Sequence, residues 1–258
     1  MKNIKKLLLI ILGIYLFLNI FLFFIQKKLL YFPDKTDFFE CNNFKKEQKK
    51  TFNKTRFYEV KWNKNNVIIF FHWNAWRACN RIWILNMLKK TWYTIIFPEY
   101  FWYADNEKNN PNIEKILNNV VDIWEYVKKK KFDKIYVMWR SLWTWPASYF
   151  AWNFKTDKLL LVSAYDKLYK VWADEFPIFP VKYLFTQNYN SVNYLKNYKK
   201  DFLLIHWKKD KVIPYKYWIN LYKNLNNFNK KLISLENGTH HNIFNIKWVK
   251  KEILDYLK

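Results

Sequence analysis

Three positions of this sequence carry residue types suited to acyl transfer by a serine. Ser141 follows an apolar run rich in β-branched and aromatic residues, and a segment with alanine and aromatic residues continues to position 152. This order predicts a strand, a sharp turn and a helix, with the serine at the turn. The chemistry also needs a base and an acid that orients it. Asp210, in HWKKDKVIP, follows a predicted strand at 202–206, and NGTHHNIF, after a predicted strand at 231–235, supplies a histidine.

Two adjacent histidines could be the base. We predict His241, because an asparagine and an apolar residue follow it, and keep His240 as the alternative. The expected oxyanion donors are the backbone N–H groups of Leu142, at the start of the helix after the serine, and of Asn74, in HWNAW.

Two other histidines, His72 and His206, each end a predicted strand. No metal-ligand spacing links them, so we expect both to be structural and to bond loop backbone. The sequence implies no metal or organic cofactor.

Tryptophan stands two positions before and two after Ser141, in W-R-S-L-W, where a strained serine turn needs glycine. The chain has 2 glycines and 15 tryptophans, together close to the roughly 18 glycines of an ordinary chain of this length. Reading tryptophan as glycine turns HWNAW into HGNAG, PEYFWY into PEYFGY, HWKKD into HGKKD and WRSLWTW into GRSLGTG. We hypothesise a gene in which UGA encodes glycine, with Trp83, Trp124, Trp218 and Trp248 left open. The alternative is a genuinely tryptophan-rich protein.

An apolar run at 7–25 is interrupted only by Gly13 and Asn19. As a helix it would rise roughly 28 Å, about the thickness of a bilayer's hydrocarbon layer. Lysines flank both ends and no small-residue cleavage site follows, so we predict an uncleaved anchor over 1–28. We expect the following domain on the extracytoplasmic side, because long domains translocate largely regardless of charge.

Residues 29–258 are expected to form one domain after a polar connector at 29–54. Predicted strands alternate with predicted helices, which indicates an α/β fold with a mainly parallel sheet covered on both faces. The aromatic insertion at 165–198 breaks this alternation; it is either a lid over the site or a set of helices packed on the sheet edge. The strands are expected at 57–60, 67–72, 93–97, 134–138, 158–163, 200–206 and 231–235, and the helices at 77–90, 112–131, 215–227 and 245–257.

The formal net charge of +24 comes mostly from lysine, in a chain also rich in Asn, Ile, Phe and Tyr. We attribute it to the codon usage of an AT-rich genome rather than to a binding surface, and we expect no nucleic-acid partner because no motif for one is present. Two cysteines, Cys41 and Cys79, are too few for a disulfide framework or a zinc site. We expect them unpaired, with a single bridge as the alternative.

With tryptophan read as glycine, the HGNAG, PEYFGY and GRSLG segments and the later Asp and His loops make the chain resemble membrane-anchored α/β-hydrolases. That branch includes aminopeptidase-like and depalmitoylase-like serine hydrolases. The resemblance spans about 29–258 and implies an α/β-hydrolase fold behind one N-terminal transmembrane helix. It also implies a monomeric serine hydrolase acting through an acyl-enzyme on an ester or thioester, with a small-molecule or lipid-like acyl substrate. The alternatives are an aminopeptidase-like peptidase and a non-catalytic membrane-tethered binding protein.

Overall fold

An eight-stranded sheet organises the computed structural model, which describes residues 2–34, 36–72, 74–101, 103–104, 112–187, 189–240 and 242–258. The strand order is β1-β2-β4-β3-β5-β6-β7-β8. Strands β3 to β8 run parallel, whereas β2 pairs antiparallel with both β4 and β1. The strands are β1 Lys49–Phe52, β2 Thr55–Val60, β3 Lys64–Phe71, β4 Tyr93–Pro98, β5 Lys134–Arg140, β6 Lys158–Val162, β7 Asp201–Trp207 and β8 Lys230–Leu235.

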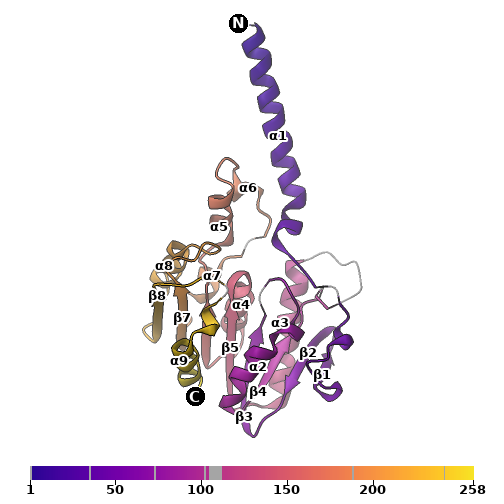
Figure 1. The fold of residues 1–258 in the computed structure, drawn as a ribbon, viewed down its shortest axis with the longest axis vertical. Helices are drawn as coiled ribbons and strands as arrows, with labels where there is room; N and C mark the ends of the chain where they lie inside the picture. The colour runs from indigo at the N-terminus through magenta and orange to yellow at the C-terminus, as the bar shows by residue number, and fades with distance from the viewer. Residues whose placement is uncertain are drawn as a thin grey trace.

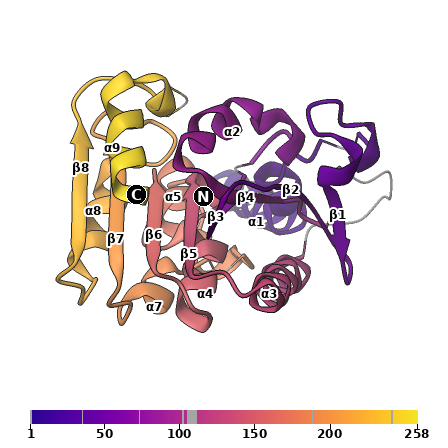
Figure 2. The same cartoon turned by 90° about the horizontal axis from the view of Figure 1, so that it is seen from below.

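Helices cover both faces of the sheet, as the alternating sequence pattern predicts (Figure 2). On one face α2 and α9 enclose an apolar cluster with side chains of β3, β4 and β6. On the other, α3, α4, α7 and α8 contribute to a second cluster. The central strands are apolar on both sides, as expected of a parallel sheet buried between helices. The bounds are α2 Ile82–Leu88, α3 Ile113–Lys130, α4 Thr144–Asn153, α7 Ser191–Leu195, α8 Tyr215–Lys223 and α9 Lys247–Leu257.

The N-terminal helix α1, Lys2–Leu30, projects from one end of the domain (Figure 1). It has the length and composition of a helix that could cross a membrane, as the sequence predicts. Beside its lower half lies the insertion between β6 and β7, which folds as α5 Leu168–Glu175 and α6 Val181–Leu184 before α7. Because α6 contacts both α1 and α5, we call 168–187 the cap.

The segment after α1 is not the polar connector that the sequence suggests. It contains two 3-10 helices, Phe38–Glu40 and Lys46–Gln48, and the edge strand β1. Phe38 and Phe44 stack on Tyr58 of β2, with ring centroids 4.5 and 4.2 Å away. The segment therefore belongs to the core of the domain.

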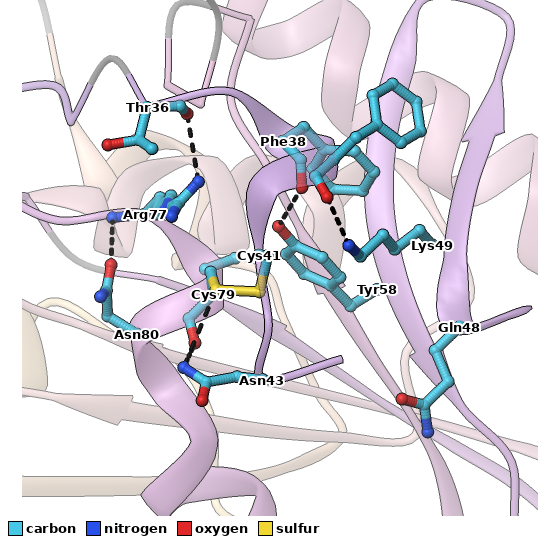
Figure 3. Close-up of a disulfide and its surroundings, with 12 residues drawn as sticks. Thr36, Phe38, Cys41, Asn43, Gln48, Lys49, Tyr58, Arg77, Cys79 and Asn80 are labelled. Atoms are coloured by element: carbon cyan, nitrogen blue, oxygen red, sulfur yellow. Dashed lines mark hydrogen bonds between the residues drawn. A yellow bond between two sulfur atoms is a disulfide. The ribbon is translucent and has the colours of Figure 1, made fainter. Parts of the chain in front are cut away.

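Cys41 and Cys79 form a disulfide, so the expectation that they are unpaired is wrong (Figure 3). Cys79 lies in a short 3-10 helix, Ala78–Arg81, that follows β3, and Asn43 donates to its carbonyl oxygen at 3.0 Å. The two Cα atoms are 5.8 Å apart because the aromatic side chains after α1 hold that segment against β2. This proximity is tertiary and leaves no trace in the cysteine spacing.

Candidate active site

Ser141 lies at the carboxyl end of the central strand β5. Its φ of 62° is left-handed, a conformation that a non-glycine residue rarely adopts. A 3-10 turn over Ser141–Trp143 leads directly into α4. The predicted strand, strained turn and helix are therefore present, and the turn directs the serine away from the strand ladder.

The serine is joined by hydrogen bonds to a histidine and an aspartate from two other strand ends. His240 Nε2 lies 2.7 Å from Ser141 Oγ, and His240 Nδ1 lies 2.7 Å from Asp210 Oδ2. The carboxylate partner implies the tautomer in which Nδ1 carries the proton and Nε2 accepts from the serine hydroxyl. All three side chains are buried.

The preference for His241 is thus not supported, because the alternative, His240, occupies the position between serine and aspartate. His241 itself lies outside the described residues. The loop that carries His240 turns at Gly238, whose φ is 144° and whose Cα lies against the ring of Trp207. The positive φ explains why this position is glycine.

Asp210 is held as a carboxylate. It accepts the backbone N–H groups of Val212 and Ile213, each at 2.9 Å. Burial by itself raises the pKa of Asp210. The hydrogen bond and charge of His240, the Ile213 N–H and His206 together outweigh burial, so the pKa of Asp210 is below its ordinary value. The group is suited to orient the histidine while remaining ionised.

His206 has the structural role predicted for it. Its Nε2 bonds the Ile213 carbonyl oxygen at 2.8 Å and so closes the loop that carries Asp210. Burial lowers the pKa of His206 to about 4, even though nearby Asp210 opposes this shift. The ring is therefore neutral at physiological pH.

His72 also contacts a carboxylate, a partner that the sequence did not predict. His72 Nε2 lies 2.8 Å from Glu99 Oε1, and the other Glu99 oxygen accepts the Ala78 N–H at 2.8 Å. Glu99 thereby joins the two ends of the loop after β3. Sequence reasoning noted the PEYFWY segment but gave Glu99 no role.

The same loop carries Asn74, the predicted second oxyanion donor. The Asn74 side chain donates to Leu30 O at 2.6 Å and accepts from Phe32 N at 3.1 Å and from the Tyr103 hydroxyl at 2.7 Å. These bonds fix the loop to the end of α1. On the elbow side, the Tyr165 hydroxyl donates to the Leu142 carbonyl oxygen at 2.7 Å, which fixes the turn after Ser141.

Arg140 is a further residue of the site that sequence reasoning missed. Its buried guanidinium donates to the backbone carbonyl oxygen of His240 and lies 5.9 Å over the Phe244 ring. Burial lowers the pKa of Arg140 to about 10, with Asp210 opposing the shift, so the side chain stays charged at neutral pH. The sequence signal that could have found Arg140 is its position beside Ser141 at the end of a buried strand. A buried arginine needs a polar partner, and that partner would lie near the serine.

The elbow accommodates both indoles, contrary to the expectation that they could not fit. Trp139 stacks on Phe71 with centroids 4.1 Å apart, and Trp143 stacks on Tyr100 at 4.5 Å. Both rings are fully buried in the cluster between β3, β5 and the loop after β4. Among the residues described, no group of three or more His, Cys, Asp or Glu side chains could hold a metal ion.

No protein-family profile matches the sequence, and no curated protein matches it significantly. Solved structures do resemble it. A Pyrococcus furiosus esterase superposes with a TM-score of 0.65 at 15% identity over 81% of this chain and 90% of the esterase. A Paleococcus ferrophilus monoacylglycerol lipase superposes with a TM-score of 0.59 at 13% identity, over 78% of this chain and 97% of the lipase. Alpha/beta hydrolase domain-containing protein 10 from mouse superposes with a TM-score of 0.59 at 14% identity, over 79% of this chain and 92% of the mouse protein. With its strand order and elbow, this chain has the α/β-hydrolase fold.

Proposed function

We propose that the protein is a serine hydrolase that cleaves an ester or thioester through an acyl-enzyme. The observation that carries the proposal is the hydrogen-bonded series Ser141–His240–Asp210, with each member at the carboxyl end of a different parallel strand or in the loop that follows it. The similar structures bear the names of esterases and lipases, which agrees with this chemistry.

In this mechanism Ser141 Oγ attacks the substrate carbonyl carbon while its proton moves to His240 Nε2. Asp210 stays ionised and stabilises the imidazolium. The N–H groups of Leu142 and Asn74 stabilise the oxyanion, and the amino-terminal end of the elbow helix adds positive potential. The leaving alcohol or thiol takes the proton from His240 as its bond to carbon breaks. Water then repeats the sequence on the acyl-enzyme and frees the acid.

Replacing Ser141 by alanine in the full chain tests the proposal. We expect Ser141→Ala to lose fluorophosphonate labelling and to lower ester hydrolysis by roughly 10⁴-fold or more. Ser148→Ala is the matched control, since Ser148 lies in the same α4 helix and its hydroxyl bonds, among the described residues, only the Thr144 carbonyl oxygen. Unchanged turnover in Ser141→Ala would refute the mechanism, and a wild-type protein that binds ligand but shows neither labelling nor turnover would favour a binding protein.

We further propose that α1 anchors the hydrolase domain on the extracytoplasmic side of a membrane. The length and apolar composition of α1 support the anchor. The Cys41–Cys79 disulfide supports the extracytoplasmic location of the domain, because such bridges persist in oxidising compartments and are rare in the cytosol.

We also propose that many of the tryptophans are glycines in the cell, through UGA recoding. Trp76 and Trp92 have left-handed φ values of 66° and 64°, where glycine is favoured and a bulky side chain is an outlier. Buried indole N–H groups without an acceptor among the described residues add a second argument. Each costs about 1–3 kcal/mol, and they belong to Trp62, Trp139, Trp145, Trp207 and Trp218.

The mass of the Lys-C peptide 135–155 from the native source tests this recoding. The peptide contains positions 139, 143, 145 and 152. Glycine masses at these positions are the expected result, and tryptophan masses would end the recoding proposal without affecting the Ser141→Ala test.

A further inference from the structure

The polar side chains within the apolar part of α1 share one helix face. Tyr15, Asn19 and Gln26 are spaced by four and seven residues, and Asn19 and Gln26 are 8% and 5% exposed in a helix that is otherwise largely exposed. In a membrane-spanning helix, polar side chains are expected to face protein rather than lipid. Tyr15 and Gln26 bond the cap. The cap lies beside the lower half of α1 (Figure 1).

Tyr15 contacts the tip of the cap, between α5 and α6. Its hydroxyl donates to the Ile178 carbonyl oxygen at 3.0 Å, and its ring is parallel to that of Phe179, with centroids 6.0 Å apart. Nearer the domain, the Gln26 amide donates to Leu184 O at 3.2 Å and accepts from Thr186 N at 2.8 Å. The cap is therefore attached to α1 at two levels.

The tip has the composition of a lipid-facing segment. Residues 176–185 read FPIFPVKYLF, with Lys182 as the one charged residue. Ile178 and Tyr183 are 69% and 81% exposed although they are large and apolar or aromatic. Large exposed side chains of this kind in one short, almost uncharged segment agree with an interaction site.

The tip backbone is also largely satisfied without water. Pro177 and Pro180 have no N–H to satisfy, while Phe176, Phe179 and Val181 donate to Trp172 O, Phe176 O and Phe179 O at 2.8–3.1 Å. Irregular backbone is tolerated at membrane depth only when its polar groups find such internal partners.

We propose that segment 176–185 is embedded in the bilayer beside α1, as a second membrane element of the chain. With a rise of about 1.5 Å per residue, Tyr15 lies about 15 Å along α1 from Ile25, near the middle of a hydrocarbon layer about 30 Å thick. The residues that touch Tyr15 lie in the same layer, and Lys182 extends its ammonium to the interface. This inference rests on the proposed anchor and not on the hydrolase mechanism.

Reporter cysteines in the full chain test the proposal in phosphatidylcholine–phosphatidylglycerol liposomes. Single variants Ile178→Cys, Leu9→Cys on α1 and Phe228→Cys are labelled with an environment-sensitive fluorophore. Phe228 is 99% exposed in the loop before β8, and the native disulfide is buried and does not compete for label. We expect Ile178→Cys and Leu9→Cys to shift to shorter wavelength, to be quenched by doxyl-labelled lipid and to lose quenching by aqueous cobalt. Phe228→Cys should be quenched by aqueous cobalt, with no quenching by doxyl-labelled lipid and no shift to shorter wavelength.

The result that overturns the inference is cobalt quenching of Ile178→Cys equal to that of Phe228→Cys. If Leu9→Cys alone is quenched by lipid, the result supports the membrane anchor and refutes the embedding of segment 176–185. If both are quenched only by cobalt, the anchor and the embedded cap fall together. Fluorophosphonate labelling of Ser141 in each variant shows separately whether the active site is intact.

Discussion

At the scale of single residues, Arg140 connects the elbow to the base. It precedes Ser141 in sequence and donates to the backbone of His240, so it fixes the distance between nucleophile and histidine. We predict that Arg140→Met lowers kcat for an ester substrate by roughly tenfold to a hundredfold, because small displacements of a catalytic group are costly. KM should change little, and Arg140→Lys should recover part of the loss.

The matched control is Arg56→Met. Arg56 also donates to a backbone carbonyl, that of Ala104, but it lies on β2, far along the sheet order from β5. Equal kcat values for Arg140→Met and the wild type would show that the His240 loop holds its place without the arginine.

His206 should make stability depend on pH. Burial holds its folded-state pKa at about 4, below the value of about 6.5 in an unfolded chain. Between these values the unfolded chain binds a proton that the folded chain does not, so the free energy of unfolding falls as the pH is lowered from 6.5 towards 4. The decrease due to this group is about 3 kcal/mol.

Urea unfolding of detergent-solubilised wild type and His206→Gln, measured across that pH range, checks the prediction. The variant should be less stable at pH 7, through loss of the bond to Ile213, but its stability should fall less steeply on acidification. Parallel pH profiles for the two proteins would contradict it.

Sequence alone could predict Ser141 and Asp210, because each follows the end of an apolar strand at a fixed place. It could not separate His240 from His241. The two are adjacent in a stretch without regular periodicity, so the sequence pattern does not fix which side chain turns inward. The choice depends on the path of the chain around Gly238 and on the bond from Arg140, which are tertiary features.

At the scale of elements, the disulfide joins the segment after α1 to the 3-10 helix Ala78–Arg81 that follows β3 (Figure 3). The bridge closes a loop with a sequence separation of 38, for which chain entropy corresponds to about 4 kcal/mol. We predict that Cys79→Ser lowers the free energy of unfolding by about that amount. Urea unfolding gives the measurement.

Cys41→Ser and the double variant serve as controls, and all three should lose the same stability because one bridge is removed in each. A double variant markedly less stable than either single variant would mean that the thiols contribute separately. The sequence did not reveal this unit, because the KKTF of β1 is too polar to be read as a strand and the segment is held by aromatic contacts with β2.

At the scale of the whole molecule, the helix proposed as an anchor is also attached to the active site. Asn74, in the loop after β3, donates to Leu30 O at the end of α1 at 2.6 Å, and Tyr31, just after α1, donates to Gln187 of the cap at 2.8 Å. Sequence reasoning predicted the apolar helix and the insertion separately, each from its own composition. Their contact depends on the tertiary path between β6 and β7, which composition does not encode.

Gln26 holds the two parts together through three hydrogen bonds: its amide donates to Leu184 O and accepts from Thr186 N and Thr186 Oγ1. We predict that Gln26→Leu releases the cap from α1, since the polar groups of 184–186 lose their partner at a cost of about 1–3 kcal/mol. In liposomes, trypsin should then cleave after Lys182 faster than in the wild type. Gln48→Leu is the control, because the Gln48 side chain accepts only the local Lys45 N–H among the described contacts. If Gln26→Leu and Gln48→Leu are cleaved at the wild-type rate, apolar packing around Leu22 and Phe179 is enough to seat the cap, and the polar contact is dispensable.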